Sequence, residues 1–397
     1  MDQMEPSMID LDRVRADTPG VAHVAHLNNA GAALMPQPVL DAQLGHLQLE
    51  AEIGGYEAAA RNADRVEHTY DAIARLLNCE REEVALVENA TRAWDMAFYS
   101  LPLGPGDRIL TAMAEYASNY IAFLEVARKT GAEIVPVPDD EHGQLDVAAL
   151  KSLVDERTKL IAVTHVPTNG GLVNPAAAIG RVAREAGVPF LLDACQSVGQ
   201  LPIDVREIGC TMLSATSRKY LRGPRGVGFL YVQRDWIERL EPVFLDMRAA
   251  EWVEPDRYEV RADARRFETW ETNVAGQLAL GVAIDYALDL GIDAIQQRVY
   301  SLADDLRFAL TAIPGVTVAD QGAERCGIVT FHVDGVPASE LQSSLSEASI
   351  NTTVAVPSGT LLDSRARALP DLVRASVHYY NSEQELERLL NIVGKVR

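Results

Sequence analysis

The stretch SATSRKYLRGPRGVGFLYV, residues 214–232, joins two short apolar runs through a loop that is rich in glycine and positive charge. Between residues 216 and 226 the loop carries Lys219 and three arginines, in a chain of 397 residues whose formal net charge is −21. Nucleic acids are bound through summed positive charge, so this acidic chain argues against a nucleic-acid partner. A solvated loop, a phosphate pocket and a catalytic lysine remain as explanations of the cluster.

The apolar run at the start of this stretch is the last of six that alternate with helical patterns. Amphipathic segments such as residues 146–156 and 176–187 separate the runs, and the second of these ends in a glycine that suits a helix C-terminus. Such alternation predicts βαβ units and a mostly parallel sheet covered on both faces, which is an α/β fold. Ligands of such sheets bind at the carboxyl ends of the strands. The predicted strands are residues 84–90, 108–116, 133–138, 160–166, 190–196 and 212–216.

From about Gln277 the pattern changes to that of a smaller α+β unit. A long helical pattern leads to an alternating strand at residues 326–335, and the chain ends in a strand followed by a helix. Ser382 and Glu385 form the Ser-x-x-Glu capping box of that last helix. We expect a large domain over residues 24–276 and a small domain built from residues 1–23 and 277–397.

Composition limits the class of protein further. No apolar run reaches the roughly 18–20 residues that span a bilayer, and the acidic, polar start is unlike a signal peptide. We therefore expect a cytoplasmic protein with no membrane partner. The four cysteines, at positions 79, 195, 210 and 326, form no C-x-x-C pair, and the histidines are scattered. We expect reduced thiols and no metal site.

Three residues near predicted strand ends suit one charged cofactor. Asp193 follows a buried apolar run, where a carboxylate is costly unless it meets a donor or a cation such as a protonated pyridine nitrogen. Thr91 stands where a strand gives way to a helix, a place that suits a phosphate or a plain helix cap. Lys219 becomes a nucleophile if burial and the arginines at 218, 222 and 225 lower its pKa. Each residue taken singly has a structural explanation, but together they fit pyridoxal 5′-phosphate (PLP).

The order of the motifs resembles the class V, fold-type I family of PLP-dependent enzymes. This family includes cysteine desulfurases, isopenicillin N epimerase and cysteine or cystine C–S lyases. The resemblance covers nearly the whole chain, and it implies a seven-stranded, mostly parallel sheet in the large domain, a smaller α+β C-terminal domain and a homodimer with shared active sites. The matching stretches are Thr91, AEYASN (114–119), THV (164–166), LLDACQ (191–196), the opening stretch and RASVHYYNSEQELERL (374–389).

The resemblance also implies roles for individual residues. Catalysis is implied for Lys219, which would bind the cofactor and move protons, for Asp193 at the pyridine nitrogen, and for Tyr116 stacked on the ring. An amino-acid substrate would meet Asn29, Tyr56 and Arg374, whose guanidinium would bind the α-carboxylate bidentately. The implied cofactor contacts are Ala90, Thr91, Tyr116, Thr168, Asp193, Gln196, Thr216, Arg218, Lys219 and Thr272, the last from the other subunit.

The chain departs from the family pattern in ways that bear on the reaction. Cysteine desulfurases carry a nucleophilic cysteine on a loop before the carboxylate-binding arginine, but residues 350–374 contain no cysteine and have Ser358 near the expected place. The family threonine that reaches the phosphate of the other subunit aligns with Glu271, so Thr272 beside it is the substitute.

We therefore expect a β-eliminating C–S lyase that acts on a cysteine S-conjugate or sulfoxide, a reaction that needs no acceptor thiol. The segment EAEIGGYEAA (50–59) is also similar to the C–S lyases of the ergothioneine pathway. Epimerisation or racemisation of an amino acid, class V aminotransfer, an atypical cysteine desulfurase and a non-enzymatic regulator are the alternatives.

Overall fold

The computed structural model describes residues 9–396, so the part of the predicted small domain at residues 1–8 lies outside the described residues. Its main feature is a sheet with the strand order β2-β8-β7-β6-β5-β3-β4. Strand β8 runs antiparallel to both of its neighbours, and the other adjacent pairs are parallel. The predicted α/β sheet is confirmed, and its strands are β2 Val84–Val87, β8 Gly228–Val232, β7 Met212–Thr216, β6 Phe190–Asp193, β5 Thr158–Thr164, β3 Arg108–Ala112 and β4 Glu133–Val137.

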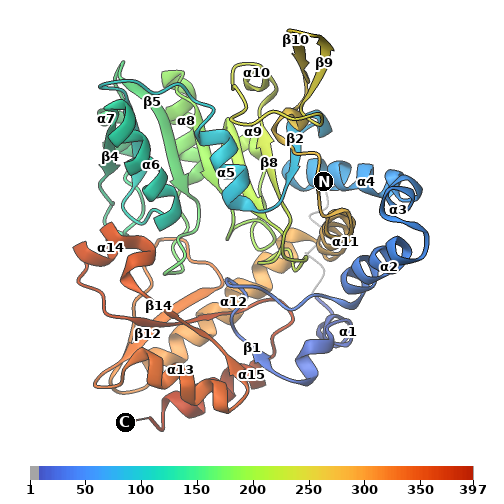
Figure 1. Ribbon diagram of the computed structural model, residues 1–397. Coiled ribbons are helices and arrows are strands. Elements are labelled where there is room, and N and C mark those ends of the chain that lie inside the picture. The colour runs from blue at the N-terminus through green and yellow to red at the C-terminus, as the bar shows by residue number, and fades with distance from the viewer. Residues whose placement is uncertain (1–8, 397) are drawn as a thin grey trace, which may run out of the picture.

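Helices cover both faces of this sheet (Figure 1). On one face the aromatic side chains of α5 and α6, among them Trp94 and Phe123, pack against alternate strand residues such as Leu191. On the other face α4, α8 and α9 pack against residues such as Leu192. Because neighbouring residues of one strand point to opposite faces, a strand covered on both sides is apolar throughout. The helices around the sheet are α4 Ala63–Leu77, α5 Ala90–Phe98, α6 Ala117–Thr130, α7 Val147–Leu153, α8 Ala176–Ala186, α9 Val205–Ile208 and α10 Arg234–Ile237.

A second apolar core lies around a four-stranded antiparallel sheet of order β11-β12-β15-β14. Figure 1 shows α1 and β1, in blue, beside the orange and red C-terminal elements. Val14 of α1 shares this core with Phe331 and Val373, and β1 pairs with β13. The boundaries at residues 24 and 277 stay a prediction. The elements are α1 Leu11–Ala16, β1 Ala25–His26, α12 Ile292–Thr311, β11 Val316–Val318, β12 Ile328–Val333, α13 Ala338–Glu347, β13 Ile350–Asn351, β14 Thr353–Ala355, α14 Leu361–Ala366, β15 Leu372–Ser376 and α15 Glu383–Val393.

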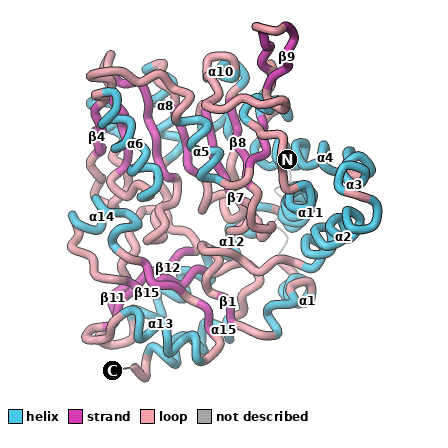
Figure 2. Tube along the Cα trace, viewed as in Figure 1, coloured by secondary structure: helices cyan, strands magenta, loops and turns pink. Residues whose placement is uncertain are grey.

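Several elements were not anticipated from the sequence. Helices α2 Gln37–Ile53 and α3 Gly55–Arg61 lead into α4. The long helix that was expected from about Gln277 is α11 Val274–Leu290, and it packs against both α2 and α4. Strands β9 Ala250–Glu254 and β10 Arg257–Val260 form a hairpin that projects from the molecule (Figure 2). Within residues 9–396 no helix is long and apolar enough to cross a membrane.

A glycine sets the distance between α5 and the sheet. A Cβ atom at Gly228 would lie 2.6 Å from the carbonyl oxygen of Ala215 and 3.0 Å from the amide nitrogen of Ala90. Any side chain there would push the first residue of α5 away from the end of β7. Gly228 therefore lets the start of α5 and the carboxyl end of β7 meet at one edge of the sheet.

Arg222, in the loop after β7, connects three distant parts of the chain. Its side chain is fully buried and donates hydrogen bonds to Thr18 Oγ1 at 2.6 Å, to the Leu34 carbonyl at 2.8 Å and to the Tyr379 hydroxyl at 2.6 Å. Its guanidinium carbon also lies 4.4 Å from the centre of the Tyr380 ring, within cation–π range. This buried arginine joins the N-terminal segment and the C-terminal unit to the large sheet.

Arg222→Met should destabilise the protein, because it leaves three buried partners without a donor while keeping most of the side-chain volume. We expect a loss of about 3 kcal/mol or more in the free energy of unfolding, measured by urea denaturation. Arg225→Met, at an exposed position three residues on, is the matched control and should stay within about 0.5 kcal/mol of the wild type. Equal effects of the two substitutions would contradict the anchoring role of Arg222.

Candidate active site

A cavity of about 430 Å³ opens at the carboxyl ends of three neighbouring parallel strands. Thr164, Asp193 and Thr216 are the last residues of β5, β6 and β7, and all three line it. Polar side chains gather there because each apolar strand ends where its chain turns away from the core. The remaining lining residues come from the start of α5, the start of α6 and the loops after β5, β6 and β7: Asn89, Ala90, Thr91, Tyr116, Val166, Thr168, Cys195, Gln196, Arg218 and Lys219.

Lys219 lies in this cavity in an environment that favours the neutral amine. Burial lowers the pKa of Lys219, and the nearby guanidinium groups of Arg218 and Arg374 lower it further, while the Asp193 carboxylate opposes the shift. A lysine must lose its proton before it can attack an aldehyde or accept a proton from carbon. The site therefore prepares Lys219 for covalent or acid–base chemistry.

Asp193 lies almost fully buried across the same cavity. Its Oδ1 accepts a hydrogen bond from the Cys195 amide at 3.0 Å, and its Oδ2 accepts one from Asn119 Nδ2 at 3.0 Å. Gln196 is also buried, and its Oε1 has no hydrogen-bond partner among the described residues. A buried carboxylate and an unpaired acceptor beside it suit a ring that carries N–H and O–H groups.

The other end of the cavity suits a phosphate. Helix α5 begins at Ala90, and Asn89 caps it by accepting a hydrogen bond from the Arg92 amide at 2.9 Å. Because Asn89 is the cap, the Thr91 hydroxyl is not needed for that purpose. The amides at the start of α5, the hydroxyls of Thr91 and Thr216, and the Arg218 guanidinium form a donor set of the kind that holds phosphate groups at helix N-termini.

Arg374, on β15 of the C-terminal unit, is held close to this cavity. Its Nη1 donates to the carbonyl and the hydroxyl oxygens of Thr168, both at 2.9 Å, and its Nη2 donates to Asn28 Oδ1 at 3.3 Å. The buried Nε has no partner among the described residues. A positioned guanidinium with a free donor suits a carboxylate.

A family model described as aminotransferase class-V matches residues 25–389. The chain belongs to this family. It is 31% identical to a probable cysteine desulfurase of Xylella fastidiosa, with 99% of this chain and 97% of that protein covered. It is also 25% identical to the solved structure of the cysteine desulfurase CsdA from Escherichia coli, with a TM-score of 0.89 and 98% of each chain covered.

A further solved structure, the cystine C–S lyase C-DES in complex with cysteine persulfide, shares the fold at 23% identity, with a TM-score of 0.86, 95% of this chain and 99% of that chain covered. Another structure of C-DES carries glycine covalently linked to its PLP cofactor. In this chain Lys219, the buried carboxylate of Asp193 and the donors that suit a phosphate line one cavity. PLP is the cofactor that this set of residues fits.

Some residues expected at the site of this class V enzyme lie elsewhere. Asn29 is buried away from the cavity, where its amide donates to the carbonyls of His26 and Ser376 and its Oδ1 accepts from the Tyr380 hydroxyl. These hydrogen bonds of the Asn29 side chain hold the N-terminal segment against β15. The neighbouring Asn28 is the residue that contacts Arg374.

Among the three arginines of the loop after β7, all of which are described, Arg218 is the one that lines the cavity with Lys219. Arg222 is buried in the anchor described above, and Arg225 is exposed. The positive charge that was expected from these two arginines is supplied by Arg374, which comes from a distant strand. Nothing in the loop sequence distinguishes a buried structural arginine from one that faces a cofactor.

Tyr56 and Thr272 also lie away from Lys219, but they lie together. Both line a separate cavity of about 570 Å³ between α3 and the segment before α11. Tyr56 is 79% exposed. Within one chain, therefore, neither residue meets the cofactor site.

Asp193→Asn tests the buried carboxylate, because an amide of the same shape cannot stabilise a positively charged ring nitrogen. We expect the variant to fold and bind PLP but to exchange the Cα hydrogen of an amino-acid substrate about 10³-fold more slowly or worse, followed in D₂O by NMR. Asp285→Asn, which removes a surface carboxylate paired with His68 and Arg75, is the matched control. Exchange at the wild-type rate in Asp193→Asn would mean that Asp193 is only structural.

Proposed function

We propose that this class V enzyme is a β-eliminating C–S lyase that acts on a cysteine S-conjugate or its sulfoxide. The observation that carries the proposal is the state of the four cysteines. A desulfurase needs a thiolate that accepts sulfur. The 3₁₀ turn Pro357–Thr360 has Ser358 where such a cysteine is expected, and Cys210 and Cys326 are buried in the cores.

Cys195 is the one cysteine among the residues that line the cavity. Burial raises the pKa of the Cys195 thiol well above its usual value, and the neighbouring Asp193 carboxylate raises it further. The thiol therefore stays protonated at neutral pH and is a poor nucleophile. This supports a reaction in which the released sulfur compound leaves without passing through a cysteine.

The residues present are sufficient for elimination. PLP, when bound, supplies an electron sink for the negative charge that develops at Cα. Arg374 binds the substrate carboxylate, and Lys219, as the neutral amine, takes the Cα proton. The Cβ–S bond then breaks, its electron pair leaves with the sulfur, and the proton on Lys219 passes to the leaving group, which departs as a thiol, or as a sulfenic acid from a sulfoxide. Water converts the remaining unsaturated amine to pyruvate and ammonia.

Incubation with S-substituted cysteines should give pyruvate, ammonia and the released thiol in equal amounts, measured by coupled assay and thiol titration. A variant in which all four cysteines are replaced should give the same one-to-one-to-one stoichiometry, because no thiol takes part. Arg374→Ala should raise KM sharply, because the carboxylate loses its partner.

Three results would contradict the lyase. A protein persulfide with alanine as the product would indicate a desulfurase, the activity for which the relatives are named. A keto acid released in step with conversion of PLP to its amine form would indicate an aminotransferase. Inversion at Cα without loss of the sulfur group would indicate an epimerase.

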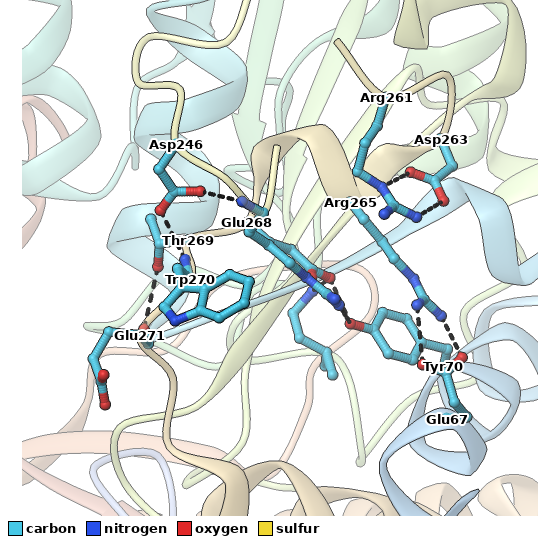
Figure 3. Close-up of polar contacts among 12 residues, drawn as sticks. Glu67, Tyr70, Asp246, Arg261, Asp263, Arg265, Glu268, Thr269, Trp270 and Glu271 are labelled. Carbon is cyan, nitrogen blue, oxygen red and sulfur yellow. Dashed lines mark hydrogen bonds and ion pairs between the residues drawn. The ribbon is translucent and has the colours of Figure 1, made fainter. Parts of the chain in front are cut away.

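We also propose that the active unit is a homodimer in which Thr272 reaches the site of the other subunit. Thr272 follows a firmly anchored segment (Figure 3): Glu268 is buried and accepts hydrogen bonds from the Tyr70 hydroxyl and from Arg248 Nε, both at 2.7 Å. Arg266 in the same segment is a second residue that could reach a phosphate, but it is buried and donates a hydrogen bond to the Ile237 carbonyl of the same chain at 3.1 Å. Thr272 is therefore the better placed of the two.

An exposed apolar surface beside this segment supports the dimer. Four nearly consecutive side chains are exposed next to Asp246, which holds the Trp270 amide at 2.7 Å. Monomers seldom leave such contiguous apolar patches in water. Trp270 of this patch lines the same cavity as Tyr56 and Thr272, the two expected site residues that a single chain leaves apart from Lys219. The four nearly consecutive side chains are Val243, Phe244, Leu245 and Met247, and Trp270 is exposed beside them.

The dimer is tested by mixing two inactive variants. Lys219→Ala removes the base, and Thr272→Glu places a carboxylate against the phosphate of the other subunit. Mixed dimers contain one intact site, so an exchanged one-to-one mixture should recover about a quarter of the wild-type activity. A fully active monomer by light scattering, or no recovery although mixed dimers form, would contradict the shared site.

A further inference from the structure

Behind the cavity lies a second buried carboxylate that the reaction described above does not use. Glu115, directly before α6, is almost fully buried and is surrounded by hydrogen-bond donors. Its Oε2 accepts from Thr111 Oγ1 at 3.1 Å and from the Thr164 amide at 2.9 Å. Its Oε1 accepts from the Thr164 hydroxyl, from the Tyr116 amide at 3.1 Å and from Asn119 Nδ2 at 2.8 Å. Five donors from β3, β5 and α6 therefore converge on one side chain.

Asn119 connects this carboxylate to Asp193. Its Nδ2 lies 2.8 Å from Glu115 Oε1 and 3.0 Å from Asp193 Oδ2. An amide NH₂ group has two hydrogens, so it can donate one to each carboxylate. With the amide turned over, its oxygen would face two carboxylates, which is repulsive. Glu115 thus fixes which end of Asn119 meets Asp193.

The contacts of Asp193 show what this arrangement achieves. One oxygen is held by the Cys195 amide and the other by Asn119, so the plane of the carboxylate is set from two sides. Both contacts are hydrogen bonds to a carboxylate, and such bonds are strong and directional. The Asn119 contact is the one that a side-chain substitution can remove.

We propose that Glu115 and Asn119 are positioning residues, and that Glu115 orients Asn119 so that Asn119 holds the Asp193 carboxylate directed at the ring nitrogen of PLP. The inference rests on Asp193 acting as the partner of that nitrogen, and it does not depend on which reaction follows. Neither residue touches substrate or cofactor in the cavity, so both act through Asp193.

The chemistry of Glu115 is consistent with this role. Burial raises the pKa of Glu115 to about 7, the hydrogen bonds from Thr164 and Asn119 oppose the shift, and the negative charge of Asp193 adds to it. Burying a carboxylate is unfavourable unless hydrogen bonds compensate for the lost hydration. Its convergent donors satisfy the ionised form, in which both oxygens accept and neither donates.

The test compares Asn119→Ala with Thr111→Val. Asn119→Ala removes the bridge, so kcat should fall about 10- to 100-fold with little change in KM, because one hydrogen bond to a charged group is lost. The visible absorbance of the PLP-loaded protein should also change its pH dependence, with the midpoint at higher pH, because a weaker partner leaves less positive charge on the ring nitrogen. Thr111→Val removes one donor from Glu115 and leaves the bridge, so it is the control for stability and should leave the midpoint unchanged.

A double-mutant cycle with Asp193→Asn separates positioning from simple structural damage. If Asn119 acts through Asp193, then adding Asn119→Ala to Asp193→Asn should lower the Cα hydrogen-exchange rate no further. Glu115→Gln should resemble Asn119→Ala in both the absorbance midpoint and the kcat, since an amide NH₂ directed at the Thr164 amide disturbs the donor arrangement. If Glu115→Gln fails to fold, Asn119→Ala still decides the matter.

Two outcomes would overturn the inference: an Asn119→Ala protein with the wild-type midpoint and kcat, or a full additional loss of exchange in the Asp193→Asn background. The absorbance and hydrogen-exchange measurements do not require elimination. A failed lyase assay with a shifted midpoint would therefore refute the proposed reaction and leave the positioning role standing.

Discussion

A buried carboxylate at the end of β6 is the constraint on which the site depends. Asp193 lies between β5 and β7 at a depth where an unpaired negative charge would be expensive. Its carboxylate accepts hydrogen bonds from two neutral donors, the Cys195 amide and the Asn119 side chain. A cationic ring nitrogen completes this environment, and Lys219 faces the same cavity. PLP would supply both a positive partner for Asp193 and an aldehyde group that suits a neutral lysine.

The fold provides this geometry through the ends of parallel strands. Thr164 and Asp193 are partners in the register of β5 and β6, so their side chains end at the same level of the sheet. Gly228 brings the start of α5 to the same edge, and Arg222 binds the N-terminal segment and the C-terminal unit to the loop that carries Lys219. The positive cluster in an acidic chain thus has divided roles: Lys219 and Arg218 line the cavity, and Arg222 holds the architecture together.

The sequence predicted the large sheet well, because strands that are covered on both faces are continuous apolar runs separated by helical patterns. The residues expected around Lys219 that belong to the ends of β5, β6 and β7 do line one cavity, since parallel strands end at a common edge. Asn29 could not be distinguished from Asn28, because which neighbour faces a cavity depends on a turn conformation that periodicity does not reveal. Tyr56 and Thr272 lie apart from the cavity in a single chain, and the proposed homodimer would account for this if each site is shared between two subunits. Glu115 was within a recognised stretch, but its role depends on donors from β3 and β5 that are close only in the folded protein.

The central claim is that Lys219, opposite Asp193, is the residue that binds PLP. The most direct measurement is reduction of the yellow PLP-loaded protein with borohydride, followed by peptide mass spectrometry to locate the attached pyridoxyl group. The account predicts a single modified site at Lys219, with the modification absent from a Lys219→Ala protein treated in the same way. Modification of another lysine, or a protein that takes up PLP without any covalent attachment, would contradict it.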